Sequence, residues 1–100
     1  MSWIPIRYRD FHDVPRAIVA EHDGSTIFLD CPFDDLADEY PDVYRVYRLD
    51  PARATGLGER SWVDLANDGR LIGEIPVDRV RFDATKRAAI DDAVFGMIGI

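Results

Sequence analysis

The sequence predicts one α+β domain: a small curved antiparallel sheet, or a partly open SH3-like barrel, of about five or six strands, with a short acidic helical turn and a C-terminal helix. Short β-rich segments follow one another along most of the 100 residues. Hairpin-type turns join them, without the helical crossovers that parallel strands need. With 47% hydrophobic and 11% aromatic residues, the chain can build one core, and its length predicts a single domain over residues 1–100.

The first strand is predicted over residues 3–11. Ile4 and Ile6 alternate with Arg7 and Arg9, which is the period-2 pattern of a strand with one buried face.

A central hairpin is predicted over residues 16–31. Two β-rich segments, 17–21 and 26–30, flank a turn that contains Asp23-Gly24, and such a pair favours the positive φ angles of a tight turn. Apolar residues on both faces of the second segment indicate a strand that is covered on both sides.

An acidic helical turn is predicted next, because Asp34 can cap it and Pro41 can end it. Leu36 and Tyr40 are four residues apart and are expected to face the body of the protein. Residues 42–49, rich in valine and tyrosine, predict another strand, although the spacing of Val43, Val46 and Leu49 would also suit a helix.

Residues 50–58 predict a loop, and 61–65 a short strand or turn. Residues 71–82 are β-like, but their alternation slips, which predicts a bulge or bend near Asp78. A helix is expected over 84–95, capped by Asp83, and the sequence places its stop at Gly96.

Charge is the most unusual bulk property, with a formal net charge of −7 and a pI near 4.6. Such a surface repels nucleic acid and anionic membranes, so neither is expected as a direct partner. The start of the chain lacks the basic and apolar stretches of a signal peptide. Cys31, the single cysteine, cannot form an internal disulfide, and a cytoplasmic location follows as the expectation.

The densest run of carboxylates predicts a partner-binding site that docks on a basic protein surface. Its residues are Asp34, Asp35, Asp38, Glu39 and Asp42. A solvated helix face is the structural alternative. A divalent metal site is a weaker one, because the run lacks the spacing of an EF-hand.

Other chemical candidates have structural explanations. The pairs His12-Asp13 and His22-Asp23 are too few for a metal phosphohydrolase, and Cys31 has no neighbouring cation in sequence to activate it. No catalytic residue, metal ligand or cofactor is therefore predicted.

Two surface features leave alternatives open. Arginines 7, 9, 45 and 48 form either a basic stripe or cross-strand pairs with aspartates. The apolar tail, 93–100, is tied into the core, sealed against a second subunit, or free as a docking peptide.

The leading hypothesis is a non-enzymatic protein-binding module that docks on a basic partner protein. By size and charge alone, the chain resembles small acidic bacterial inhibitor or immunity proteins. One alternative is a small hydrolase or ligand-binding domain that uses aspartates, with or without a divalent metal. Another is a structural homo-oligomer, with a homodimer formed through the tail.

Overall fold

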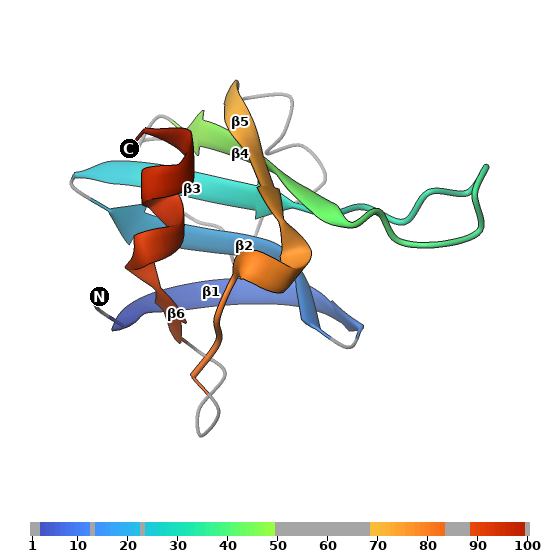
Figure 1. Cartoon of the computed structure of the whole chain (residues 1–100), viewed down its shortest axis with the longest axis horizontal. Coiled ribbons are helices and arrows are strands. Elements are labelled where there is room, and N and C mark those ends of the chain that lie inside the picture. Colours follow the sequence, from blue (N-terminus) through green and yellow to red (C-terminus); the bar gives the residue numbers. More distant parts are fainter. Residues whose placement is uncertain (1–2, 13, 23, 50–68, 84–88, 100) are drawn as a thin grey trace.

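The computed structural model describes residues 3–12, 14–22, 24–49, 69–83 and 89–99. Within these residues the protein consists mainly of strands (Figure 1). The elements are β1 (Trp3–His12), β2 (Val14–His22), β3 (Ser25–Asp30), β4 (Val43–Leu49), β5 (Arg70–Pro76), the 3₁₀ turn η2 (Val77–Arg79), β6 (Ala89–Asp91) and the 3₁₀ helix η3 (Asp92–Ile98). The predictions for 50–58 and 61–65 lie outside the described residues.

The strands form one antiparallel sheet in the order β5-β4-β3-β2-β1-β6. It is strongly curved, and within the described residues it does not close into a barrel (Figure 1). The predicted antiparallel sheet is therefore confirmed.

The β2–β3 hairpin lies at the centre of the sheet, as predicted. His22 pairs with Ser25, so a two-residue connection joins the strands. Gly24 adopts a φ of 76°, a conformation that glycine reaches without a Cβ clash. Local turn chemistry thus sets the register of the two most buried strands.

The two faces of the sheet carry separate apolar clusters. The larger contains Ile18, Ile27 and Tyr44 together with Phe95 of η3, so the helix covers this face (Figure 1). The smaller, on the opposite face, is built around Phe28. The expectation that β3 is covered on both sides is confirmed.

The bend expected near Asp78 is present as η2, which ends β5 at Pro76. The chain then turns, and Phe82 forms an isolated bridge with Ile90 of β6. Residues on either side of the bend therefore pair with different strands, which explains the slip in their alternation.

The C-terminal helix is confirmed, but its predicted bounds are wrong. Residues 89–91 form β6, paired with β1, and the helix η3 begins at Asp92. Residues 84–88 of the predicted helix lie outside the described residues. Strand pairing from a distant part of the chain overrides a local helical pattern here. Asp91, in place of the predicted Asp83, caps the helix by accepting a hydrogen bond from the Ala93 amide at 3.0 Å, and it is buried.

The helix also continues through the predicted stop. Gly99, with a φ of 78°, is its C-terminal cap in place of Gly96. None of the helices in the described residues is long and apolar enough to span a bilayer.

Candidate functional site

The predicted acidic residues lie on the connection between β3 and β4, residues 31–42, which we call the acidic arm. It extends well away from the sheet (Figure 1). Within it, the side chains of Asp34, Asp35, Asp38, Glu39 and Asp42 are all exposed. The structure therefore brings the five carboxylates onto one projecting segment.

The outer part of the arm is a small hairpin-like turn and not the predicted helical turn. Asp34 and Glu39 exchange backbone hydrogen bonds of 2.9 and 3.3 Å. The Asp34 carboxylate accepts hydrogen bonds from the amides of Leu36 and Ala37 at 3.0 and 3.2 Å. Asp34 is thus a capping residue, as predicted, but the amides that it caps belong to a closed turn.

The tip of the arm exposes an apolar side chain that the sequence placed elsewhere. Leu36 was expected to face the body of the protein together with Tyr40, but it is 100% exposed. Tyr40 does pack against the core, as expected. The prediction for Leu36 fails because helical spacing does not apply in a turn, where the side chain at the apex faces solvent.

The base of the arm is anchored to the sheet through Cys31. Its amide donates a hydrogen bond of 2.8 Å to the carbonyl of Arg16 on β2. Its thiol donates to the carbonyl of Pro41 at 3.3 Å, which joins the two legs of the arm. At the end of the arm, the Val77 amide donates to the Asp42 carbonyl at 2.8 Å.

Aromatic contacts stiffen the same region. The Arg16 guanidinium lies 4.3 Å from the centroid of the Tyr40 ring, and the Phe33 ring meets Tyr40 edge-on at 5.1 Å. Phe33 remains 44% exposed. The arm is therefore a built projection whose base is packed and whose outer part is open to solvent.

In the folded chain, Cys31 lies beside a cation that its immediate neighbours in the sequence do not provide. The Arg16 Nη1 atom donates to the Cys31 thiol at 3.5 Å. Burial nevertheless raises the pKa of Cys31 above its usual value, and it outweighs the lowering effect of Arg16. The thiol is 0% exposed, which fits the predicted structural role and not that of a nucleophile.

A groove runs beside the arm, between it and strands β4 and β5, with a volume of about 450 Å³. It is lined by Asp30, Pro32, Phe33, Asp34, Asp35, Leu36, Pro41, Val43, Arg45 and Glu74. The groove does not follow from the local sequence, because Val43 and Arg45 belong to β4 and Glu74 belongs to β5.

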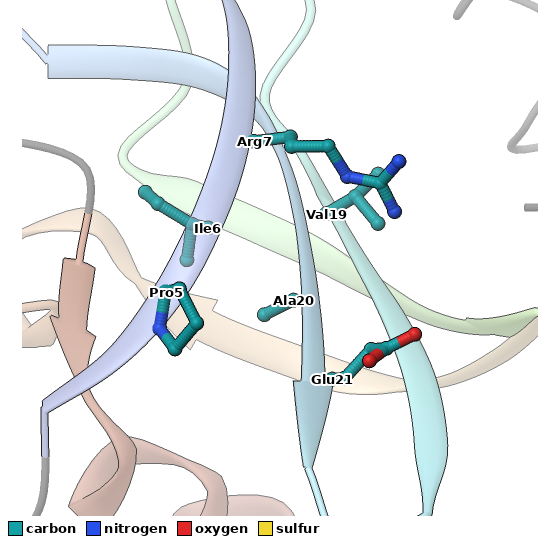
Figure 2. A pocket seen from close by; sticks show the side chains of 6 residues that line it. All are labelled: Pro5, Ile6, Arg7, Val19, Ala20 and Glu21. Atoms are coloured by element: carbon teal, nitrogen blue, oxygen red, sulfur yellow. The ribbon is translucent and has the colours of Figure 1, made fainter.

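A second depression of about 300 Å³ lies on the β1–β2 ladder. Arg7, Val19 and Glu21 project to the same side of this ladder (Figure 2). Arg7 and Glu21 are the charged residues of its lining, and their formal charges cancel. This depression lacks the strong charge bias of the groove beside the arm.

Of the two alternatives for the arginines, the single basic stripe does not form. Two strands, β2 and β3, separate Arg7 and Arg9 on β1 from Arg45 on β4. The register places Arg45 directly opposite Asp30 on one side and Glu74 on the other, as the cross-strand alternative requires. The other arginines of this set do not follow it in the register, since Arg7 lies opposite Val19 and Arg48 lies opposite Ile27 and Arg70.

The remaining candidates from the sequence, a histidine and the apolar tail, are packed within the fold. The His22 ring packs on Phe95 at 4.8 Å, and no group of three potential metal-ligating side chains converges within the described residues. In the tail, Val94, Phe95 and Ile98 pack on the core of the same chain.

Comparisons with protein-family models, with curated proteins and with solved structures give no match for this chain. Fold and site together define a small antiparallel β domain that carries a projecting acidic arm.

Proposed function

We propose that the protein is a non-enzymatic protein-binding module, an acidic inhibitor or immunity-like protein that docks on a basic partner through the acidic arm. One observation carries this proposal. Leu36 is 100% exposed at the tip of an anchored projection, and carboxylates lie on both sides of it in the sequence. An exposed large apolar side chain ringed by one sign of charge is suited to a protein interface.

Charge and apolar contact have separate parts in this proposal. The net charge of −7 attracts a basic partner over long range and raises the association rate. Burial of a leucine side chain contributes about 1.5–3 kcal/mol to an interface. The anchored base favours binding further, because an ordered loop loses less conformational entropy than a mobile one.

The alternatives receive less support. A hydrolase or metal-dependent ligand-binding domain needs converging ligands, and the described residues offer no such group. A homo-oligomer sealed by the tail needs apolar tail residues on the outside. Phe95 is 0% exposed, but Met97 is 53% exposed, so a homodimer through the tail stays the second candidate.

The proposal also covers the form of the sheet and the location of the protein. β5 lies at one end of the strand order, and η2 leads from it to Phe82, which bridges β6 at the other end. This return of the chain supports a partly open SH3-like barrel.

A single buried cysteine fits the reducing cytoplasm in which such a module would act.

Paired charge reversals test the docking proposal. Asp35→Lys with Glu39→Lys alters the arm, and Glu21→Lys with Asp78→Lys alters exposed acids elsewhere. Each replacement of an acid by lysine changes the net charge by +2, so both double variants have a net charge of −3 instead of −7. Asp34 is spared because its carboxylate closes the turn. Only the position of the lost charge differs.

The variants are compared by affinity capture from the native host's lysate at low and high salt, read by quantitative mass spectrometry. We expect one basic protein to be recovered at low salt with the wild type and the Glu21/Asp78 variant, and lost with the Asp35/Glu39 variant. Equal recovery with all three proteins would contradict docking through the arm.

Leu36→Ser then tests the apolar tip without a change of charge. Because the side chain of Leu36 is fully exposed, its replacement leaves stability within about 0.5 kcal/mol. We expect affinity for the captured partner to fall about tenfold, mainly through faster dissociation. Unchanged dissociation would exclude the tip from the interface.

A further inference from the structure

We infer that the groove between the acidic arm and strands β4–β5 is a receptor for a single arginine side chain of the partner. The role of the groove in binding a partner rests on the proposed function, but its affinity for an arginine side chain can be tested without a partner. The inference depends on the charge of the groove, on its aromatic wall and on its position beside the exposed tip.

The charge of the groove favours a cation. Its lining contains four carboxylates, those of Asp30, Asp34, Asp35 and Glu74, and one guanidinium, that of Arg45. Four negative charges and one positive charge leave a formal charge of −3. The Arg45 position, opposite both Asp30 and Glu74 in the register, compensates only part of this excess.

The walls of the groove suit a side chain with an apolar stem and a flat cationic end. Pro32, Pro41 and Val43 supply apolar surface. Phe33 lines the same groove, is 44% exposed and packs against Tyr40 at an interplanar angle of 78° with the ring centroids 5.1 Å apart. A partly exposed aromatic ring can stack with a guanidinium.

These features favour arginine over lysine. A guanidinium is planar, stacks on aromatic rings and binds carboxylates through two parallel hydrogen bonds. An ammonium is more strongly hydrated and lacks the flat face. The volume of about 450 Å³ lies within the range of small-ligand pockets, about 300–1,000 Å³.

The position of the groove connects it to docking. Leu36 and Asp35 belong both to the tip of the arm and to the groove lining. A partner that covers the tip would therefore place its own side chains over the groove. An arginine inserted there would be partly shielded from water, where its pairing with carboxylates is stronger than on an open surface.

The test is an NMR titration of the full chain with acetyl-arginine amide, observed through backbone amides. Acetyl-citrulline amide, which has a similar shape but no charge, and acetyl-lysine amide are the comparison probes. We expect saturable shifts at Phe33, Arg45 and Glu74 with arginine, and at least about tenfold weaker binding of citrulline, since the charge-assisted hydrogen bonds are lost. Lysine should bind more weakly than arginine.

Two variants examine the walls separately. Glu74→Gln removes one charge on β5, outside the arm, and Phe33→Leu removes the aromatic face but keeps an apolar side chain. Each should weaken arginine binding about threefold or more, whereas the matched control Glu21→Gln should not change it. Shifts that spread over all exposed acids without saturation, or equal binding of citrulline, would overturn the inference.

The partner experiment separates the two proposals. If the Asp35/Glu39 reversal abolishes capture while Glu74→Gln and Phe33→Leu change neither capture nor arginine binding, docking stands and the arginine receptor is wrong. If arginine binds in the groove but capture is independent of the arm, the docking function is wrong.

Discussion

Cys31 joins β3 to the acidic arm, and its thiol has both a cation and a carbonyl as neighbours. Arg16 donates to the sulfur, and the sulfur donates to Pro41. The first contact favours the thiolate and the second favours the thiol. Burial decides between them, since the side chain is 0% exposed and the pKa of Cys31 is raised. The protonated thiol is therefore a structural link between the legs of the arm.

This pKa shift predicts a loss of stability at alkaline pH. Below the ordinary pKa of 9.0 the thiol is protonated in both states, so its contribution is fully present. As pH rises further, the unfolded thiol ionises first, and the free energy of unfolding falls by at most about 1.4 kcal/mol per pH unit until the folded pKa is reached. Burial also raises the pKa of Tyr44, which extends the loss to higher pH.

Urea unfolding at pH 8, 9 and 10 measures this effect, with Cys31→Ala as the matched variant. The wild type should lose more stability between pH 9 and pH 10 than Cys31→Ala, which keeps Tyr44 but has no thiol. Equal losses in the two proteins would mean that Cys31 titrates alike in the folded and unfolded states.

Individual side chains differ in how far sequence predicts them. Ile27 and Phe28 were expected on opposite faces of a strand, and each is buried in its own cluster, because alternation alone determines this. Leu36 was expected inside and is exposed. Its environment depends on the path of the turn, which residue spacing does not specify.

At the scale of elements, local interactions were predictable and long-range pairings were not. The β2–β3 hairpin follows from adjacent residues and an Asp-Gly turn. By contrast, Ala89–Asp91 has a helical pattern, but pairs as a strand with β1, more than 80 residues earlier in the chain. The helix η3 is accordingly shorter than its pattern, and it depends on tertiary contacts for its stability.

One of those contacts is the approach of η3 to β5 at Gly73. A Cβ atom at Gly73 would lie 2.7 Å from Ile98 Cγ2 and 3.1 Å from Ile98 Cβ. Neither atom is at the flexible end of a side chain, so Gly73→Ala has to displace the end of the helix. We expect a loss of about 1–3 kcal/mol in the free energy of unfolding, measured by chemical denaturation.

Gly96→Ala is the matched control, because nothing lies within 4 Å of the added Cβ. It should stabilise the protein by about 0.5–1 kcal/mol through helix propensity. In the double variant Gly73→Ala/Ile98→Ala, the cost of the first change should be much reduced. Equal costs of Gly73→Ala with and without Ile98 would show that the clash is not the cause.

For the whole molecule, the sequence located the run of carboxylates but not the shape of the surface that contains it. The carboxylates of 34–42 form a dense run in sequence, and their exposure follows from their charge. The groove combines that run with Arg45 and Glu74, which come from β4 and β5. A site made by the meeting of three segments requires the sheet order, and one sequence does not supply that order.

The net charge of −7 also predicts how the whole fold responds to salt. Repulsion among like charges destabilises a compact state, and salt reduces it as the screening length falls from about 30 Å at 0.01 M to about 8 Å at 0.15 M. We expect the melting temperature to rise by several degrees over this range of NaCl, equivalent to about 1 kcal/mol, and then to level off. The Asp35/Glu39 and Glu21/Asp78 reversal variants, each at −3, should gain less. A melting temperature that fell with added NaCl would mean that attractive pairs, such as Arg45 between Asp30 and Glu74, outweigh the repulsion.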